Sequence, residues 1–401
     1  MRMRVLGAGL QGSACAYDLL QDESVEQVVL ADQKTDTLPT FLDRYRDDPR
    51  LRLIRFDARS KDDIRAAMRG MDACMNALPY YFNLDVATVA VEEGVHYSDL
   101  GGNTAIVFDQ LKLDDRAREA GISVIPDCGL APGMVNILAA AGIDELDEAD
   151  TVRIRVGGLP QDPQPPLNYQ IVYSLHGVLD YYTTPSWVLR EGEPRQVDAL
   201  TEIEPVDFPD PVGTLEAFHT AGGLSTMPWT YRDRLTTMEY KTLRYPGHAD
   251  QMRTIRDLGL LDLDPVEIDG VHVAPRDVFI ACAEPRLLRP QAADLVALRV
   301  EAEGRKDGQP ARVVFDLLDY YDEDTGISAM ERTTGFSLAI TGLLQARKQF
   351  RTAGVLTPDL AVPAELYIDE LRRRNIRITR RVDTGAARAD AAGRKASVTG
   401  V

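Results

Sequence analysis

The sequence is poor in cysteine and has no long apolar run. Its 401 residues include four cysteines, which stand far apart without paired spacing, so neither a disulfide framework nor a zinc cluster is expected. No stretch reaches the ~18 apolar residues of a membrane-spanning helix, and arginine interrupts the apolar residues at the N-terminus, unlike in a signal peptide. We therefore expect a cytoplasmic protein without a membrane partner.

Acidic residues outnumber basic ones, 63 to 45, and histidine is scarce. The formal net charge is -18 and there is no basic stripe, so binding to the phosphate backbone of nucleic acid is not expected. The five histidines are scattered and no His-Glu-x-x-His motif occurs, so no metal site is expected. The expected binding partner is a small molecule.

Up to about residue 127 the sequence alternates short apolar runs with helical patterns. This order is typical of a parallel sheet with helices on both faces. Ser60 occupies an N-cap position, and Gly94 and Gly121 are placed to end helices. The pattern predicts an α/β, Rossmann-type doubly wound sheet. Its six predicted strands are residues 3–6, 28–31, 51–56, 73–78, 96–99 and 122–126.

The rest of the chain predicts a second, α+β domain, in agreement with a length that suits two domains. The segments "VEIDGVHV", with Asp269-Gly270 at its turn, and "LVALRVEAEG" with "ARVVFDLLDYY" predict two antiparallel hairpins. Helical spacing predicts a helix over 333–347 that returns to the first domain. Residues 383–401 are small, polar and aperiodic, and we expect a flexible tail there.

Three glycines follow the first predicted strand. Gly7, Gly9 and Gly12 fit G-x-G-x-x-G and open a helix at Leu10 and Gln11. The first glycine permits a tight turn, the second lets the backbone approach a pyrophosphate, and the third lets the helix pack on the strand. The helix N-terminus also favours phosphate charge. The motif predicts a dinucleotide site.

Acidic residues follow the next two strands. Asp32 lies 20 residues beyond Gly12 and can accept hydrogen bonds from an adenosine ribose, which favours NAD over NADP. The neighbouring Lys34 could weaken this preference. Asp57 is placed to approach the adenine, although an acid at such a position is as often a helix cap.

The residues after the fourth strand are predicted to lie near the nicotinamide, because ligands of such sheets bind beyond the carboxyl ends of the strands. Asn76, Ala77 and Leu78 are expected beside its ribose. Tyr80 or Tyr81 could contribute a hydroxyl group, or could equally be a half-buried aromatic side chain.

Polar residues also follow the fifth and sixth strands. Asp99 could serve the ligand, or could bind the nearby backbone or cap the next helix. For Cys128, an inert buried thiol is expected over a reactive one, because no positively charged residue stands next to it in the sequence.

Several longer motifs resemble the saccharopine dehydrogenase family. The resemblance extends to about Arg381 and includes "NALPYYFN", "YSDLGGN", "GLAPGM", "GGLP", "YSLHGVLDYY", "LEAFHTAGG" and "YKTLRYPGH". It implies a dinucleotide-binding domain at 1–130 completed by about 331–382, an α+β substrate and dimerisation domain at 131–330, and a homodimer. Within the family, the sequence is most similar to members that oxidise the ε-amine of lysine with NAD.

The resemblance also bears on the substrate. Saccharopine-forming members typically carry Pro-Asn-Arg-Asp where this chain has "FHTAGG", residues 218–223. Saccharopine has three carboxylates, so the missing arginine argues for a smaller substrate. The family implicates a tyrosine of the "PY" motif and polar groups at positions that match Tyr80, Asp99 and Cys128.

Oxidation of an amine requires its lone pair, whereas the ammonium of free lysine has a pKa about three units above neutrality. A base is therefore required. Asp99, assisted by Tyr80, is the predicted base and His219 the alternative, although a lone histidine is as often structural. Arg244 is the first candidate to bind the α-carboxylate and Arg332 the second, unless they form ordinary ion pairs.

Two other functions remain open at this point. One is an NADPH-dependent reductase that joins an amine to an aldehyde or keto acid, as for saccharopine or carboxynorspermidine, so the substrate would be an amino acid or a polyamine. The other is a non-catalytic NAD-binding module, which would bind the cofactor without turnover.

Overall fold

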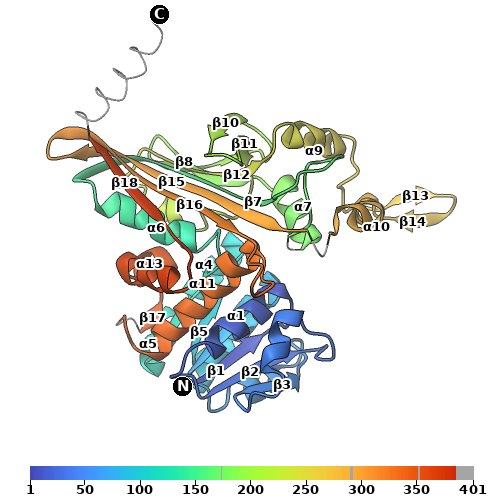
Figure 1. Ribbon diagram of the computed structural model, residues 1–401, viewed down its shortest axis with the longest axis vertical. Helices are drawn as coiled ribbons and strands as arrows, with labels where there is room; N and C mark the ends of the chain where they lie inside the picture. The colour runs from blue at the N-terminus through green and yellow to red at the C-terminus, as the bar shows by residue number, and fades with distance from the viewer. Residues whose placement is uncertain (173, 290–291, 351–352, 385–401) are drawn as a thin grey trace, which may run out of the picture.

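The computed structural model describes residues 1–172, 174–289, 292–350 and 353–384. They form two large sheets in separate layers, with the N-terminal sheet in the lower part of Figure 1 and the second sheet above it. The helices α6 (Met134–Asp144), α11 (Ala329–Ala346) and α13 (Ala364–Arg373) lie between the two layers. One continuous apolar core runs from the first sheet through these helices to the second.

The first sheet has seven parallel strands in the order β17-β6-β5-β4-β1-β2-β3. This is the doubly wound order, and the six strands predicted from the sequence are confirmed. The seventh strand was not predicted, because two residues give no period. The strands are β1 (Arg2–Leu6), β2 (Gln27–Asp32), β3 (Leu51–Arg55), β4 (Ala73–Asn76), β5 (His96–Asp99), β6 (Ser123–Ile125) and β17 (Gly354–Val355).

The helices of the first domain begin and end as their capping residues predict. The Ser60 hydroxyl accepts the N–H of Asp63 at 3.2 Å, and Gly94 and Gly121 both have φ of 69°, which a glycine adopts readily. The elements are α1 (Leu10–Leu20), η1 (Thr40–Tyr45), α2 (Lys61–Met68), η2 (Tyr80–Phe82), α3 (Asn83–Glu93), α4 (Thr104–Leu111) and α5 (Asp114–Ala120).

Helix α11 returns to the first sheet, as its helical spacing predicts. It begins earlier than expected, because Ser328 and Glu331 form a capping box at its N-terminus. A side chain at Gly335 would lie 2.6 Å from the carbonyl oxygen of Gln11, so glycine permits the close approach of α11 to α1. Gln345 donates to the carbonyl groups of Tyr97 and Ser123 at 3.0 and 3.1 Å, which attaches the far end of the helix to β5 and β6.

The second sheet has the order β10-β11-β12-β7-β15-β16-β18, with β8 attached to β12 and β9 attached to β8. It is antiparallel, as expected, except that β12 pairs with β7 in parallel. The strands are β7 (Glu148–Pro160), β8 (Ser186–Arg190), β9 (Glu193–Val197), β10 (Glu204–Asp207), β11 (Thr214–His219), β12 (Thr237–Arg244), β15 (Asp294–Lys306), β16 (Gln309–Tyr320) and β18 (Thr379–Thr384).

Both predicted hairpins are confirmed. β15 pairs with β16 around Asp307-Gly308, and β13 (Val266–Ile268) pairs with β14 (Val271–Val273) around Asp269-Gly270. All four turn residues have positive φ, which Asp-Gly sequences favour. The remaining helices are α7 (Leu175–Thr183), α8 (Met227–Thr230), α9 (His248–Asp257), α10 (Pro275–Leu287) and α12 (Pro358–Ala361).

Residues 383 and 384, which the sequence assigned to the tail, instead belong to β18. Asp383 pairs with Arg312 in the β16–β18 ladder, because an edge strand can form without a strongly apolar sequence. The rest of the expected tail, 385–401, lies outside the described residues. Among the residues that the structure describes, no helix has the length and apolar character needed to cross a membrane.

Candidate active site between the two sheets

The glycine turn after β1 has the geometry that a dinucleotide requires. Gly7 has φ of 93°, and a side chain there would lie 2.9 Å from the carbonyl oxygen of Ala77. A side chain at Gly12 would overlap the carbonyl oxygen of Gly7, whereas one at Gly9 would meet no atom within 4 Å. The first and third glycines therefore serve packing, and the second leaves open space beside the backbone.

The N-terminus of α1 faces this open space. Gly9 is its N-cap, no side chain caps it, and its first turn carries no acid. Uncapped N–H groups and the helix dipole suit a pyrophosphate, so these residues fit the predicted dinucleotide. Leu10 is half exposed at the start of the helix.

Of the two predicted adenosine-side acids, Asp32 contacts the glycine turn directly. Asp32 ends β2, and its carboxylate accepts the N–H of Ala8 at 2.7 Å and that of Lys34 at 2.9 Å. Asp57 is bound by the guanidinium of Arg59 at 2.8 Å. This pairing lowers the pKa of the Asp57 carboxyl well below its usual range, and Asp57 also contacts the Gln33 side chain at 3.2 Å.

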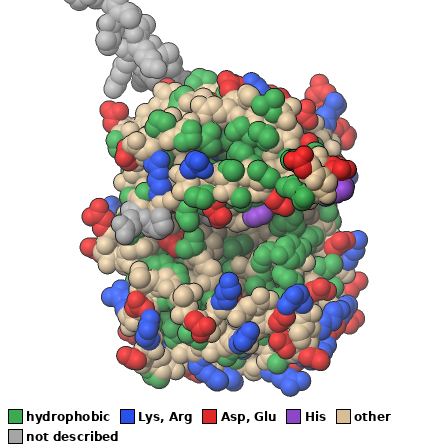
Figure 2. Space-filling model, turned by 90° about the vertical axis from the view of Figure 1, so that its right-hand side faces the viewer, with side chains coloured by type: hydrophobic (Ala, Val, Ile, Leu, Met, Phe, Trp, Pro, Cys, Tyr) green, Lys and Arg blue, Asp and Glu red, His purple; other side chains and the backbone are tan. Residues whose placement is uncertain are grey.

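A cavity of about 700 Å³ opens between the two sheets. Figure 2 shows it as a hollow bordered by apolar side chains. The first domain, the connection to α6, and the second domain all contribute to it. Its lining residues are Gln11, Ala77–Tyr81, Leu100, Gly101, Gly129–Pro132, Val156–Gly158, Ser174, His176, Gly177, Asp180, Tyr181, Ala221, Tyr240, Thr242, Arg244, Met330 and Thr334.

The segment after β4 supplies one wall of the cavity. Ala77, Leu78, Tyr80 and Tyr81 line the cavity. Asn76 does not: its amide donates to the Asn83 side chain and the Tyr97 hydroxyl, both at 2.9 Å. Asn76 therefore shapes the turn instead of facing the ligand.

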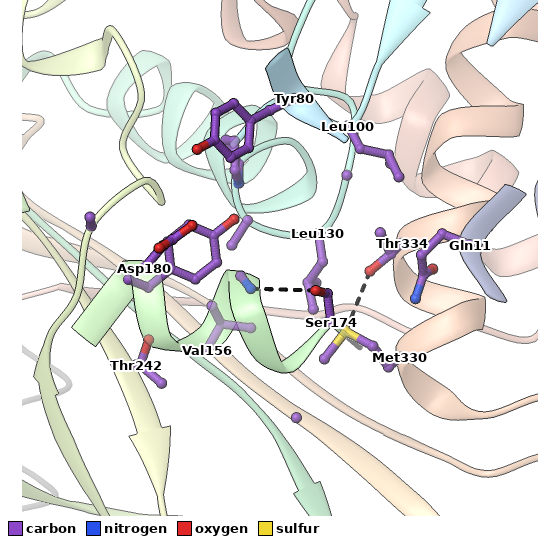
Figure 3. A pocket seen from close by; sticks show the side chains of 18 of the residues that line it. Gln11, Tyr80, Leu100, Leu130, Val156, Ser174, Asp180, Thr242, Met330 and Thr334 are labelled. Atoms are coloured by element: carbon purple, nitrogen blue, oxygen red, sulfur yellow. Dashed lines mark hydrogen bonds between the residues drawn. The ribbon is translucent and has the colours of Figure 1, made fainter. Parts of the chain in front are cut away.

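Gln11 lines the cavity from α1, opposite Tyr80 and Asp180 (Figure 3). Both polar atoms of its side chain are buried, and neither has a hydrogen-bond partner among the described residues. An unpaired buried amide is costly, so a ligand group in the cavity is the natural partner for it.

Asp99 does not line the cavity. It is fully buried, and its carboxylate accepts the N–H groups of Gly101 and Asp127 at 2.8 and 3.1 Å and the Gln110 amide at 2.7 Å. Burial raises the pKa of this carboxyl, and the same hydrogen bonds oppose the rise. The geometry supports the structural alternative for Asp99 and gives it no path to a substrate proton.

Cys128 is also buried behind the cavity wall. Its thiol donates to the carbonyl group of Ile125 at 3.2 Å. Burial, with the charge of Asp99 next, raises the pKa of the Cys128 thiol well above its usual range. It therefore has the character of the inert buried thiol that the sequence favoured.

His219 lies on β11, away from the cavity lining. It is fully buried, with Nδ1 3.2 Å from the Tyr240 carbonyl oxygen and Nε2 3.1 Å from the Glu202 carboxylate. Glu202, His219 and Glu239 place three possible ligand atoms within 4.8 Å of one another. Arg190 pairs with both carboxylates, at 3.0 and 2.8 Å, so this cluster is an ion-pair network of the sheet.

The two candidate arginines have different positions. Arg332 pairs with Asp319 at 2.9 Å and with Asp322 at 3.2 Å, outside the cavity lining, and this matches the ion-pair alternative. Arg244 lines the cavity from β12. Its guanidinium lies 4.9 Å from the centre of the Tyr169 ring and donates to the Tyr182 hydroxyl at 3.2 Å.

Helix α7 supplies two cavity residues that the sequence analysis did not single out. His176 and Asp180 both line the cavity, and their spacing of four residues places them on one face of the helix. That spacing stands in the motif "YSLHGVLDYY", so it was available as a signal. Asp180 accepts from the guanidinium of Arg276 at 2.5 Å, which keeps its carboxylate at the cavity edge.

Tyr80 lies above Asp180 in Figure 3. Burial raises the pKa of the Tyr80 hydroxyl, and the negative charge of Asp180 adds to the rise. The hydroxyl therefore stays protonated near neutral pH and can donate a hydrogen bond, whereas it is poorly suited to accept a proton as a base.

Comparisons with known proteins agree with this architecture. Residues 3–125 match the saccharopine dehydrogenase NADP binding domain, and residues 129–376 match the saccharopine dehydrogenase C-terminal domain. The apo saccharopine dehydrogenase (L-Glu forming) of Saccharomyces cerevisiae has a TM-score of 0.76 at 18% identity, over 95% of this chain and 99% of that one. At this identity the likeness concerns the fold alone.

This chain aligns with different shares of two curated relatives. Carboxyaminopropylagmatine dehydrogenase of Synechocystis sp. is 23% identical over 381 residues, which cover 88% of this chain and 91% of that protein. The mitochondrial alpha-aminoadipic semialdehyde synthase of Bos taurus is 26% identical over 280 residues, which cover 66% of this chain and 29% of that protein. The matched part is therefore less than a third of the bovine protein.

Proposed function

The chain belongs to the saccharopine dehydrogenase family of oxidoreductases, and from this premise we propose that it oxidises the ε-amine of L-lysine with NAD. The products are 2-aminoadipate 6-semialdehyde, ammonium and NADH. One water molecule supplies the aldehyde oxygen, and one proton is released per turnover.

The charge of the cavity lining carries this proposal. Among the described residues that line the cavity, Arg244 is the only arginine or lysine and Asp180 the only acid. One cation matches one carboxylate, whereas saccharopine has three carboxylates. Lysine offers one carboxylate and two amines, in agreement with this lining.

Arg244 is the proposed partner of the α-carboxylate. Its guanidinium is held by the Tyr182 hydroxyl, the Tyr169 ring and the carbonyl oxygen of Leu243, the last at 2.8 Å. A planar guanidinium that is already oriented loses little freedom when it binds two carboxylate oxygens. This site would fix the end of lysine that does not react.

Asp180 and His176 are proposed to act on the ε-amine, in place of Asp99 and His219. Asp180 holds the ammonium, and His176, one helical turn away on α7, accepts its proton. The neutral amine then provides the lone pair that allows a hydride to leave the ε-carbon. Tyr80 donates a hydrogen bond at the same end of the cavity.

Bound NAD would supply the hydride acceptor, and the glycine turn with the N-terminus of α1 would hold its pyrophosphate. Asp32 is proposed to bind the adenosine ribose and to favour NAD over NADP. Ala77 and Leu78 would border the nicotinamide ribose, because they stand at the carboxyl end of β4 and line the cavity.

The direct test is an absorbance assay of the reduced nicotinamide. The purified protein is incubated with NAD or NADP and a panel of L-lysine, L-ornithine, cadaverine and agmatine. We expect lysine with NAD to give the highest kcat/KM and to release ammonium in equal amount to NADH. Absence of lysine turnover with both cofactors would overturn the proposal.

A reductive condensation is the second candidate, because the match to the Synechocystis dehydrogenase covers 91% of that protein. It predicts NADPH consumption when a diamine or agmatine is mixed with an amino-acid aldehyde, and no oxidation of lysine. Nucleotide binding without turnover in either direction would instead indicate a binding module.

A further inference from the structure

His248 lies behind the cavity wall at the start of α9. It ends the motif "YKTLRYPGH", four residues after Arg244. Arg244 is among the described residues that line the cavity, whereas His248 and Tyr182 are not. Arg244, His248 and Tyr182 are all buried, at 3%, 2% and 1% exposure. His248 can therefore affect a substrate only through its neighbours.

The hydrogen bonds of His248 can run in only one direction. Its Nδ1 lies 3.1 Å from the carbonyl oxygen of Leu167, which can only accept, so Nδ1 carries the proton. Burial, with the charge of Arg244 next, lowers the pKa of His248 to about 3, so the ring is neutral and Nε2 is an acceptor. The Tyr182 hydroxyl lies 3.0 Å from Nε2 and therefore donates to it.

Tyr182 connects His248 to Arg244. Because its proton points at His248, its oxygen presents lone pairs to Nε of Arg244, which donates to it at 3.2 Å. A guanidinium has no acceptor, so this bond requires a tyrosine proton that is held elsewhere. The bonds form a relay from Arg244 through Tyr182 to His248, which ends on the Leu167 carbonyl group. Removing His248 would leave the buried Tyr182 proton without this acceptor, which is costly.

Aromatic rings enclose His248 and connect it to Arg244 a second time. The His248 ring lies edge-on to Tyr182, with centres 5.7 Å apart, and within 14° of parallel to Phe218. Its centre is 5.4 Å from that of Tyr169, and the Arg244 guanidinium lies 4.9 Å from the centre of the same Tyr169 ring. Such ring contacts favour one orientation of the imidazole.

Glu216 of β11 anchors the backbone on both sides of His248. Its carboxylate accepts the N–H of Gly247 at 2.8 Å and that of Ala249 at 2.6 Å. In the pairing of β11 with β12, Glu216 stands opposite Arg244. The start of α9 is therefore fixed to the same pair of strands that carries Arg244.

We propose that His248 is a positioning residue, which through Tyr182 orients Arg244 for a carboxylate and so makes the site prefer amino acids to diamines. The Nε bond to Tyr182 and the Nη1 bond to the Leu243 carbonyl, at 2.8 Å, together fix the plane of the guanidinium. Binding of two carboxylate oxygens depends on that plane. This role rests on the proposed oxidation of lysine, in which Arg244 binds the α-carboxylate.

The test compares three ligands of the lysine site in His248→Phe and Tyr182→Phe. Cadaverine is lysine without its carboxylate, and 6-aminohexanoate is lysine without its α-amine. We expect KM for lysine and the inhibition constant of 6-aminohexanoate against lysine to rise roughly tenfold in both variants, while the inhibition constant of cadaverine stays within about twofold. The double variant should show no further rise, because both changes break the same relay.

The matched control is Tyr17→Phe. The Tyr17 hydroxyl also accepts from a guanidinium, that of Arg44 at 2.9 Å, and Tyr17 is 6% exposed. It does not belong to the described lining of the cavity, so all three constants should stay at their wild-type values. If His248→Phe does not fold, His248→Leu takes its place, because it also removes both ring nitrogens.

Three outcomes would overturn the role of His248 while lysine oxidation stands. They are an unchanged KM for lysine in a folded His248 variant, an equal rise for lysine and cadaverine, and the same rise for lysine in Tyr17→Phe. The failure of the proposed function is distinct from these, because the wild type itself would then not oxidise lysine, and the role of His248 would be overturned with it.

Discussion

Asp180 of α7 and Arg276 of α10 form an ion pair with 2.5 Å between the carboxylate oxygen and the guanidinium nitrogen. The Arg276 side chain is buried, at 5% exposure, while that of Asp180 is 39% exposed. Arg276 also donates to the Thr183 hydroxyl at 3.0 Å and the Leu261 carbonyl at 2.8 Å. A buried cation thus holds a carboxylate at the cavity edge.

Replacing the Asp180 carboxylate tests its proposed role. Asp180→Asn removes the negative charge that would hold the ε-ammonium, and a hydrogen bond to a charged group contributes about 1.5–3 kcal/mol. We expect KM for lysine to rise roughly 10- to 100-fold, with the Kd for NAD unchanged. Steady-state kinetics and a fluorescence titration with NAD measure the two effects.

The control for this variant is Asp144→Asn. Asp144 pairs with Arg234 at 3.0 Å, so the change also removes one ion pair, but it does so outside the cavity lining. An unchanged KM for lysine in Asp180→Asn, or an equal rise in both variants, would contradict the role given to Asp180.

The glycine turn offers a pair of variants with opposite effects. Gly12→Ala would overlap the carbonyl oxygen of Gly7, whereas the Cβ of Gly9→Ala meets open space. We expect Gly12→Ala to lower the melting temperature, and Gly9→Ala to keep it while weakening NAD binding at least tenfold, because its methyl group occupies the pyrophosphate space. Thermal melts with and without NAD separate the two effects. Tight NAD binding by Gly9→Ala would place the nucleotide elsewhere.

Much of the first domain is predictable because its signals are local. Strand and helix periods alternate regularly up to residue 127, and the glycine turn, Ser60 and Gly94 each act on their immediate neighbours. The two Asp-Gly hairpins are local in the same sense. β17 and the parallel pairing of β12 with β7 escape prediction, because both depend on segments far apart in the sequence.

The candidate site is less predictable, because it forms where separate segments meet. Strand-end position selected Ala77, Leu78 and Tyr80, which line the cavity, but it could not reveal that the neighbouring backbone binds Asp99. His219 has a suitable chemistry, but it is not among the described residues that line the cavity. The spacing of His176 and Asp180 was visible in the sequence, whereas Arg276 is 96 residues from Asp180 and had no local signal.

His176 and Asp99 can be separated by the effects of replacing each. His176→Gln should lower kcat by about 10²- to 10⁴-fold, because the proton acceptor is lost. Asp99→Asn should instead lower the free energy of unfolding by about 1–3 kcal/mol and change kcat little, because its amide nitrogen stands where a carboxylate oxygen accepts the Gln110 amide. If Asp99→Asn lost kcat and His176→Gln only lowered the free energy of unfolding, Asp99 would again be the candidate base.

Asp127 predicts how stability depends on pH. Burial, with the charge of Asp99 next, raises the pKa of its carboxyl to about 8, against a hydrogen bond from Ser225. The unfolded chain has a value of about 3.9, so between pH 4 and pH 8 the folded state binds more protons than the unfolded state. The free energy of unfolding should therefore fall as pH rises through this window, by up to about 1.4 kcal/mol per pH unit from this one group.

The variant Asp127→Asn removes this titration while keeping an acceptor for Ser225. Its free energy of unfolding, measured by urea at pH 5, 6, 7 and 8, should fall less steeply than that of the wild type over the whole range. Asp359→Asn is the matched control, because burial raises the pKa of Asp359 only to about 6, so it should change the slope below pH 6 and leave the interval from 7 to 8 as in the wild type. Equal slopes for wild type and Asp127→Asn between pH 7 and pH 8 would mean that Asp127 is already ionised in the folded protein at these pH values, against the effect of its burial.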